Sequence, residues 1–277
     1  MIEIPESYNL AEQAQEALSG KTITQVINPG SPHKFTWYYG DPSTYGDLLV
    51  GKQIQGASGH GMYLDLHLDG DLRISIGDGT NLRYHRPQDP RPDKHQLLIV
   101  FHDNSFLVFT VGMYGAIAAY KGPLDNKYHS GSLNSISPLD DRFDKAFFDS
   151  IFRSVGKDLS MKALLATEQR IPGLGNGVLQ DILFNSGIHP KRKMSTLSDF
   201  EKEELFHNLK FNLRSMAHNG GRDTEKDLFG HFGAYKTLLS KNTYKEPCIN
   251  CGSSIVKEAY LGGSVYYCPV CQPLKKS

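Results

Sequence analysis

The side chains with the clearest chemical pattern are the four cysteines, which all lie in the last 30 residues of the 277-residue chain. They form two Cys-x2-Cys pairs, Cys248 with Cys251 and Cys268 with Cys271, separated by sixteen residues. As thiolates, two such pairs can close on one tetrahedral ion, and the spacing matches known zinc sites. Disulfides are the competing interpretation, but they are rare in cytosolic chains. Because four thiolates leave no open coordination position, we expect one structural zinc ion.

A second pattern is the stretch RIPGLGNGVLQDILFNSGIHPKRK, which begins at residue 170. Gly173 and Gly175 would let the backbone approach a phosphate, and a helix beginning at Asn176 would direct its free amides and dipole to the same place. A glycine pair before a helix is also a common turn, so both interpretations stay open. Lys191 and Arg192 follow, either as phosphate contacts or as part of a solvated basic loop.

The third pattern is the N-terminal stretch MIEIPESYNL, in which Glu3 lies between Ile2 and Ile4. This alternation is typical of the first strand of a half-buried sheet. The carboxylate would instead have a chemical role if the α-amine of Met1 takes part in a reaction. A primary α-amine with an ordinary pKa of about 7.7–8.0 is partly unprotonated at neutral pH and can act as a nucleophile.

Two further groups of side chains leave their roles open. The aromatic stretch FTWYYGDPSTY, residues 35–45, could offer stacking platforms for bases, or could serve core packing and an exposed loop. Five histidines are scattered among predicted turns and strands, so we expect surface or hydrogen-bonded roles and no second metal site. They are His33, His60, His85, His95 and His102.

The elements that must position these residues change character along the chain. The first ~135 residues contain short strand-like runs separated by turn signals, a pattern typical of an antiparallel β-sandwich or barrel. Only AEQAQEALSG, ending at Gly20, has a helical pattern there. The predicted strands are KTITQVI, GMYLDLHL, DLRISIG, NLRYH, HQLLIVFHD, SFLVFTVGM and GAIAAYKG.

Helical spacing begins after NSISPLDDRFD, a predicted hinge, and gives four or five short helices. The longest begins with a capping box, Ser198 with Glu201, and ends at Gly220 and Gly221. Between the cysteine pairs, SSIVKEAY and GGSVYYC predict a hairpin. We therefore expect an α+β chain with an N-terminal antiparallel β-sandwich in residues 1–135, a helical domain in 136–240 and a β-hairpin zinc finger in 241–277.

Composition and charge restrict the classes of function. Charged residues make up 22% of the chain, and the net charge is zero. Residues 1–150 hold 12 Lys and Arg against 18 Asp and Glu, whereas residues 151–277 hold 18 against 12. This asymmetry indicates either a polyanion-binding C-terminal half or a solvated basic surface. We find no signal peptide and no apolar run long enough to span a membrane, so a cytoplasmic protein is expected.

Taken together, these motifs resemble the formamidopyrimidine-DNA glycosylase and endonuclease VIII family. The shared features are an acidic third residue followed by Pro5-Glu6, a β-rich first half, GLGN opening a helix that ends in GIHP, and a terminal CxxC–x16–CPxCQ finger. The resemblance spans essentially the whole chain. It implies a β-sandwich, a helix-two-turn-helix domain and a zinc finger, with duplex DNA between the halves. Family enzymes flip a damaged base out of the stack.

The resemblance also implies roles for individual residues. Glu3 matches the catalytic acid, Asn176 matches an asparagine that binds phosphate at the lesion, and Asp181 matches an acidic position on the same helix. Tyr114, in FTVGMYG, is the expected remnant of the wedge that fills the gap left by the flipped base. The four cysteines match the zinc ligands.

The departures from the family pattern fall on its cationic and nucleophilic positions. Ile2 stands where the family has its nucleophilic proline, and a large second residue is expected to keep Met1 in place. No lysine occurs near Met62, Gly263 replaces the arginine of the finger, and Asp78 stands at a usual wedge methionine. We expect that the lost cations are replaced by Arg222, Lys226, Lys236, Lys241 and Lys245, or that these side chains are simply solvated.

The leading hypothesis is a DNA-repair-type glycosylase, acting as a monomer on damaged duplex DNA, with a non-standard active site around Glu3. Met1 would supply an imine-forming amine and a lyase step, or Glu3 would orient a water without one. The alternative is a catalytically silent DNA- or RNA-binding protein on the same scaffold. A third possibility is activity on modified RNA or a bulky crosslink.

Overall fold

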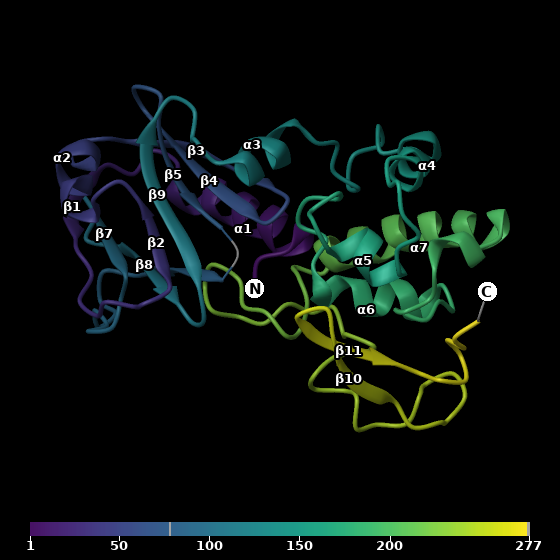
Figure 1. Cartoon of the computed structure of the whole chain (residues 1–277). Coiled ribbons are helices and arrows are strands. Elements are labelled where there is room, and N and C mark those ends of the chain that lie inside the picture. The colour runs from purple at the N-terminus through teal and green to yellow at the C-terminus, as the bar shows by residue number, and fades with distance from the viewer. Residues whose placement is uncertain (78, 276–277) are drawn as a thin grey trace.

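A computed structural model describes residues 1–77 and 79–275 of the chain, and its first element already differs from the sequence prediction. Helix α1 (Ile4–Leu18) begins where a strand was predicted. Pro5 explains the error, because its fixed φ suits the first turn of a helix and its missing N–H is no loss there. Ile2 packs into the core of the β-sandwich, whereas Ile4 packs among the C-terminal helices. The N-terminus therefore joins the two halves, and it lies between them in Figure 1.

The predicted β-sandwich is confirmed as two sheets. One has the strand order β1-β7-β8-β6 and the other β2-β9-β5-β4-β3. All seven predicted strands are present: β1 (Ile23–Ile27), β4 (Tyr63–Leu68), β5 (Leu72–Ile76), β6 (Thr80–His85), β7 (Leu97–Phe101), β8 (Phe106–Val111) and β9 (Gly115–Lys121).

Five elements of this half were not predicted. They are β2 (Thr36–Tyr39), η1 (Pro42–Thr44), α2 (Tyr45–Leu49), β3 (Ile54–His60) and α3 (Lys127–Asn134). The sequence of β3, IQGASGH, lacks the β-branched and aromatic residues that mark strands. Strand β2 pairs parallel to β9, so the prediction of a wholly antiparallel sandwich was wrong at this edge.

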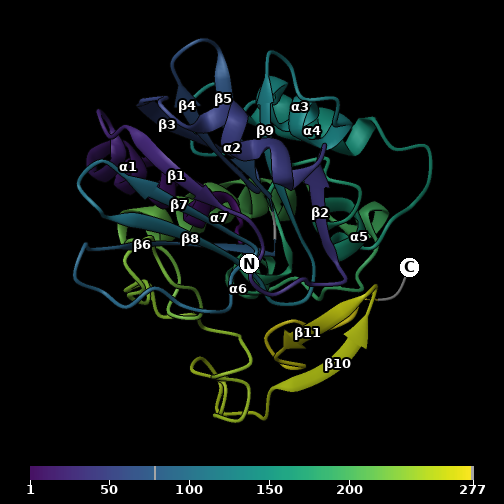
Figure 2. The same cartoon turned by 90° about the vertical axis from the view of Figure 1, so that its left-hand side faces the viewer.

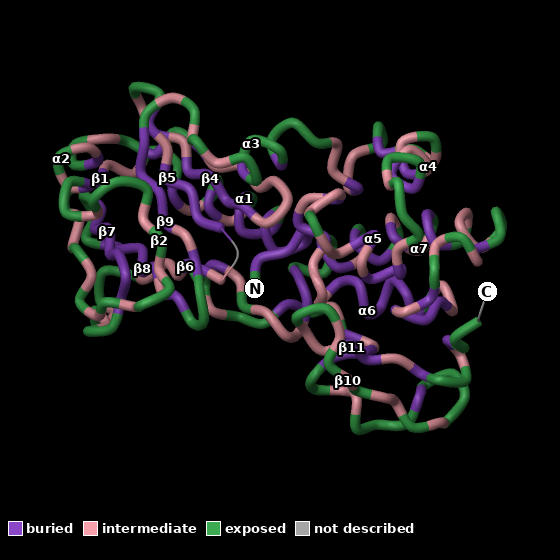
Figure 3. The backbone as a smooth tube through the Cα atoms, in the orientation of Figure 1, coloured by how far each residue is buried: buried purple, intermediate pink, exposed green. Residues whose placement is uncertain are grey.

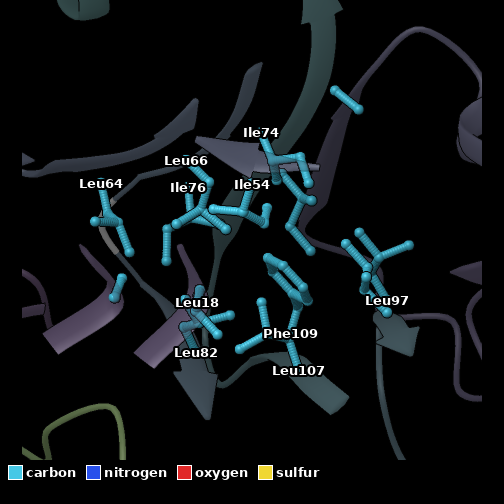
Figure 4. Packing of buried hydrophobic residues seen from close by; sticks show 14 of the residues in the cluster. Leu18, Ile54, Leu64, Leu66, Ile74, Ile76, Leu82, Leu97, Leu107 and Phe109 are labelled. Atoms are coloured by element: carbon cyan, nitrogen blue, oxygen red, sulfur yellow. The ribbon is translucent and has the colours of Figure 1, made fainter. Parts of the chain in front are cut away.

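Apolar side chains from both sheets meet between them, as Figure 4 shows. Helix α1 covers the β3 and β4 side of the second sheet. In the view of Figure 2 the two sheets are seen beside α1, with the hairpin of the C-terminal finger projecting below. Leu228, far along the chain, also packs into this core, so the loop after the helices is anchored on the sandwich.

The C-terminal half is helical, as predicted, and has its own buried core. Its helices are α4 (Lys145–Arg153), α5 (Met161–Ala166), α6 (Asn176–Asn185) and α7 (Asp199–His218), with a 3-10 turn η2 (Met194–Thr196). The predicted capping box is present, because Ser198 Oγ accepts the Glu201 amide and Glu201 accepts the Ser198 amide. Gly220 and Gly221 follow the helix with positive φ angles of 69° and 97°.

The finger contains the predicted hairpin, β10 (Val256–Tyr260) paired with β11 (Gly263–Tyr267). Figure 3 shows buried positions on the sandwich strands and inner helices, whereas much of β10 is intermediate or exposed. No helix in the described ranges is long and apolar enough to cross a membrane. The proposed domain boundaries at residues 135 and 240 stay a prediction.

Candidate active site and nucleic-acid interface

Glu3 lies at the meeting point of helices α1 and α6. Its carboxylate accepts hydrogen bonds from the amides of Gly177 and Val178, both at 2.8 Å, so it caps the N-terminus of α6. Helix dipoles favour a negative charge at this position. Burial nevertheless raises the pKa of Glu3, against the opposing effects of Arg222 and the two amides. A carboxyl group with a raised pKa is suited to giving and taking protons near neutral pH.

The glycines of the GLGN motif serve this packing. Gly173 has a φ of 77°, and a Cβ atom there would lie 2.1 Å from the carbonyl carbon of Gly61. A Cβ atom on Gly175 would lie 2.4 Å from a carboxylate oxygen of Glu3. The structure uses these glycines for the close approach of Glu3 and the β3–β4 turn, and their contact with a phosphate stays a prediction. The Glu3 carboxylate lies at the N-terminus of α6, where a phosphate was one of the two interpretations.

Arg222, another of the predicted DNA contacts, has carboxylate partners within the protein. Its guanidinium is buried, with Nε and Nη2 donating to Glu6 at 2.9 and 2.8 Å and Nη1 lying 3.4 Å from Glu3. These contacts and the adjacent carboxylates raise the pKa of Arg222 further. We call Glu3, Glu6 and Arg222 the Glu3–Arg222 cluster. Arg222 neutralises two buried carboxylates of the N-terminal segment, a partner that sequence reasoning had not found.

Met1 and Glu3 line the same cavity, which has a volume of about 420 Å³. We call it the N-terminal cavity. The α-amine of Met1 forms an ion pair with Glu225, which also lines the cavity. The Tyr114 hydroxyl lies 3.9 Å from the Met1 sulfur. The structure therefore brings together three candidate site residues, Met1, Glu3 and Tyr114, and adds Glu225.

Asn176 also lines this cavity, at the first turn of α6. Its Nδ2 donates to the backbone oxygen of Ser264 in the finger at 2.6 Å, and its Oδ1 is buried without a partner. Rotating the Asn176 side-chain amide would place its NH2 group where Oδ1 now lies. A phosphate oxygen accepts hydrogen bonds from such an NH2 group. Lys241, one of the predicted replacement cations, lines the same cavity.

Lys191 and Arg192, the basic pair after α6, both bind carboxylates of the protein itself. Arg192 is buried, and two guanidinium nitrogens donate to Glu201 at 2.7 Å. A phosphate contact at this residue stays a prediction. Lys191 donates to Glu258 in the finger at 2.7 Å and lies over the Tyr260 ring. Both cations are paired with carboxylates, because the chain folds β10 and the start of α7 against this loop.

Lys162 was missed by the sequence reasoning. It lies on α5, is 3% exposed, and donates to the Tyr260 backbone oxygen at 2.5 Å. Its Nζ would lie 3.6 Å from a Cβ atom on Gly263, where the family pattern has an arginine. The Lys162 ammonium group therefore lies beside the place where the family's arginine side chain would be. It supports the hairpin through its hydrogen bond to Tyr260. The only signal for this residue in the sequence was its position in the first turn of a helix, just after the cap residue Ser160.

The four cysteines fit a metal. Their sulfur atoms all lie within 4.8 Å of one another, with Cys248 and Cys271 at 3.7 Å and Cys251 and Cys268 at 3.5 Å. A tetrahedral site with zinc–sulfur bonds of about 2.3 Å has sulfur–sulfur edges of about 3.8 Å. All four are free thiols, so the disulfide alternative finds no support.

Asp181 connects α6 to the segment that leads into the finger. It lies at 0% exposure, and its carboxylate accepts the amides of Leu238 and Leu239, both at 2.9 Å. Burial raises the pKa of Asp181 to about 6, against the effect of these hydrogen bonds. Position 78 lies outside the described residues, so the predicted change of wedge residue there has no structural account.

One of the scattered histidines does belong to a cluster. His60 and His129 both place Nε2 within 3.1 Å of Asp65, and Ser75 donates to the same carboxylate at 2.5 Å. Burial alone would raise the pKa of Asp65, but the hydrogen bonds from His129 and His60 hold it well below its usual range. The hydrogen-bonded role expected for His60 is therefore present, with partners that the sequence did not indicate.

Comparison with known proteins settles the family. The sequence profile of the formamidopyrimidine-DNA glycosylase N-terminal domain matches residues 1–149. The chain belongs to this family. A formamidopyrimidine-DNA glycosylase of Bacillus cereus is 27% identical over 280 residues, covering 99% of each chain, and one of Oceanobacillus iheyensis is 27% identical over 283 residues, covering 100% of this chain and 99% of its own.

Solved structures of family members show the same fold. A complex of the Lactococcus lactis family protein with DNA containing an abasic site has a TM-score of 0.81 at 21% identity, covering 98% of this chain and 99% of that one. The family protein of Thermus thermophilus has a TM-score of 0.80 at 20% identity, covering 99% and 100%. The fold expected from the resemblance is therefore confirmed.

Proposed function

We propose that the protein is a DNA glycosylase that removes damaged bases from duplex DNA, with Glu3 and the Met1 α-amine as its reacting groups. The observation that carries the proposal is their position on the wall of one cavity, between the sandwich and the finger. Relatives covering the whole chain are named formamidopyrimidine-DNA glycosylases, which supports the reaction class. As proposed, the protein acts as a cytoplasmic monomer.

The proposed reaction uses the amine as nucleophile. The Met1 nitrogen first gives a proton to Glu225, its ion-pair partner, because a protonated amine has no free electron pair. The nitrogen then bonds to C1′ of the damaged nucleotide as the bond from C1′ to the base breaks. The base leaves with the bonding electrons and takes up the second proton that the nitrogen loses, so the nitrogen keeps a free electron pair.

Glu3 acts in the next step. The sugar ring opens as the C1′–O4′ bond breaks, the nitrogen electron pair forms a C=N bond, and the Glu3 carboxyl donates its proton to O4′. Burial raises the pKa of the Glu3 carboxyl, against the opposing effect of Arg222, so this group holds a proton more readily than an exposed glutamate does. The product is a protonated imine between Met1 and the opened sugar, from which the lyase step can follow by elimination.

The proposed zinc ion is bound by Cys248, Cys251, Cys268 and Cys271, and it holds the finger together without an open coordination position. The finger in turn fixes Asn176 through Ser264. The ion contributes structure, and the reacting groups come from the N-terminal segment.

A second candidate, a catalytically silent DNA-binding protein, is favoured by one observation. Both reacting groups already have partners, because Met1 is paired with Glu225 and Glu3 caps α6. In that case the N-terminal segment would serve only to join the two halves.

The test is to incubate the protein with duplexes that carry abasic sites or a panel of damaged bases, with and without borohydride. Borohydride reduces the imine to a stable covalent adduct, so trapping identifies amine chemistry. Glu3→Gln is expected to lower the rate of adduct formation about 10²–10⁴-fold, because ring opening loses its proton donor, and Glu225→Gln to move the pH–rate profile. Glu16→Gln, on the exposed side of α1, is the matched control and should leave the rate unchanged.

Three results are decisive. An adduct with normal Glu16→Gln activity supports the amine route. Base release without an adduct overturns the role of Met1 and supports a water activated by Glu3. DNA binding with neither release nor adduct, together with no effect of Glu3→Gln, supports the silent binding protein.

A further inference from the structure

A second cavity lies beside the N-terminal cavity and shares Tyr114 with it. It has a volume of about 620 Å³, and we call it the Trp37 cavity. Its wall includes four aromatic and two amide side chains, those of Trp37, Tyr63, Tyr114, Tyr128, Asn126 and Gln169. It is built from both halves of the protein, since β2 supplies Trp37, α3 supplies Tyr128 and the loop before α6 supplies Gln169.

Two of the aromatic side chains in this wall are unusually exposed. Trp37 is 58% exposed and Tyr128 is 52% exposed, although large aromatic side chains are normally mostly covered. The Trp37 ring lies 6.4 Å from the Tyr114 ring. Aromatic rings that line an open cavity are suited to stack on nucleobases, which all present a flat π-face.

The floor of the cavity is rigid. Tyr63 stacks on His60 at 5.5 Å and meets His129 edge-on at 5.1 Å, and both histidines are held by the buried carboxylate of Asp65. A Cβ atom on Gly77 would lie 3.1 Å from the Tyr63 ring, so glycine lets the ring lie close to its strand. A site that is fixed before binding loses less entropy when a ligand enters.

The polar groups of the wall are amide donors. The Asn126 side-chain oxygen accepts the amides of Tyr128 and His129, and the Gln169 side-chain oxygen accepts the Gly173 amide. The NH2 group is therefore the part of each side chain that remains to bind a ligand. Carbonyl oxygens, as on thymine, guanine or oxidised bases, accept from such groups.

The backbone beside these donors is strained. Glu168 and Gln169 both have positive φ angles, 61° and 52°, which non-glycine residues rarely adopt. Such strain costs stability and is concentrated at binding and catalytic sites. Here the turn is held by Arg170, which donates to the Thr167 backbone oxygen at 3.1 Å and pairs with Glu168.

We propose that the Trp37 cavity is a second nucleobase site, which takes an unstacked base next to the nucleotide held in the N-terminal cavity. The inference rests on the proposed DNA binding and adds a contact beside the reaction centre. Tyr114 separates the two cavities, so one strand passing over it would present successive nucleotides to both. Met62, near which this chain has no counterpart of the family's lysine, lines this cavity, so stacking replaces a charged contact there.

The sole tryptophan of the chain makes the test direct, because all tryptophan fluorescence reports on Trp37. The catalytically disabled Glu3→Gln protein is titrated with an abasic-site duplex, and binding is followed separately by fluorescence anisotropy of labelled DNA. We expect tryptophan quenching that saturates together with binding. A flanking 2-aminopurine in the DNA should change its emission in the same titration.

Trp37→Ala is expected to weaken duplex binding about 5- to 100-fold, the range for loss of one stacked base, with an unchanged single-turnover rate at saturating DNA. Phe35→Ala is the matched control, since Phe35 is 49% exposed just before the same strand and lies outside the cavity wall. Asn126→Asp keeps the cap of α3 but removes the NH2 donors, and it should weaken binding several-fold when the flanking base carries carbonyl groups.

Unchanged tryptophan emission at saturating DNA overturns the second site, and so does equal weakening by Trp37→Ala and Phe35→Ala. Both outcomes leave the proposed glycosylase intact, because base release is measured separately. Quenching and selective weakening without base release would support the second site and overturn the proposed activity. Absence of DNA binding overturns both.

Discussion

The cysteine cluster and the Glu3–Arg222 cluster each hold distant parts of the fold together, but over very different lengths of chain. Cys248 and Cys271 are 23 residues apart, whereas Glu6 and Arg222 are 216 apart. The first cluster shapes one hairpin and the second joins the first helix of the sandwich to the loop after α7. The difference shows that a local motif can build the finger, whereas the reaction centre requires the whole chain to be folded.

The largest expected effect comes from breaking the cysteine cluster. Cys268→Ser should release the metal and unfold the finger, because structural zinc binding contributes about 10–16 kcal/mol at neutral pH in zinc-finger peptides. Metal analysis should fall well below one ion per chain, and limited proteolysis should cut within the finger.

The control for this change is Ile249→Ser, between the cysteines of the first pair, where the side chain is 70% exposed. It should keep a full complement of metal. Retention of one tightly bound zinc by Cys268→Ser would contradict the closed four-thiolate site.

The next effect tests the long-range cluster. Arg222→Leu leaves Glu3 and Glu6 buried without their cation, so the free energy of unfolding should fall by about 3–5 kcal/mol. Thermal unfolding should show a midpoint lowered by roughly 10 °C, on a scale of about 2–4 °C per kcal/mol.

Arg214→Leu serves as the matched change, because Arg214 forms an exposed ion pair with Asp141. Exposed pairs contribute about 0–1 kcal/mol, so the midpoint should move little. Equal effects of the two substitutions would mean that the Glu3–Arg222 cluster does not join the halves of the fold.

Asp181 links the two clusters, because it lies on α6, which Glu3 caps, and accepts amides of the segment that leads into the finger. The pH dependence of the free energy of unfolding tests this link. The pKa of about 6 in the folded protein lies above the ordinary value of 3.8, so the folded state binds the proton more tightly. This stabilisation is fully present below about pH 3.8 and is lost as the pH rises through about 6, by about 2–3 kcal/mol.

Asp181→Asn should remove this slope, which urea unfolding between pH 4 and pH 8 measures as a difference from the unchanged protein. Subtracting the two curves cancels the titration of the histidines. Asp199→Asn, on the fully exposed first turn of α7, should keep the slope. If the free energies of unfolding of Asp181→Asn and of the unchanged protein depend on pH in the same way, Asp181 does not link the two clusters.

The smallest effect concerns the hairpin tip. Gly262 has a φ of 74° in the turn between β10 and β11, so Gly262→Ala should cost about 1–2 kcal/mol of hairpin stability. Faster transfer of zinc to a chromogenic chelator would show it. Gly131→Ala, in open space within α3, should leave that transfer rate unchanged and stabilise its helix by about 0.5–1 kcal/mol. An unchanged transfer rate for Gly262→Ala would show that the turn does not limit the finger.

Sequence patterns predicted the local features of both regions. The cysteine spacing, the capping box at Ser198 and the seven strands all depend on neighbours within one element, where chain geometry fixes which side chains meet. Strand β3 and the start of α1 were missed because local propensity was weak or ambiguous there. The short β2 was also missed, although its exposed Trp37 had been considered as a stacking platform.

The sequence by itself determined the cysteine site, the β-sandwich followed by helices, and the choice of Glu3 and Met1 as candidate reacting groups. Only the tertiary structure decided that Arg222 and Arg192 are buried and paired with carboxylates, that Glu3 caps the N-terminus of α6, and that Trp37 borders a cavity beside the reaction centre. The physical reason is that charge and exposure depend on which segments fold together. An arginine reads the same in the sequence whether a carboxylate 216 residues away or a phosphate is its partner.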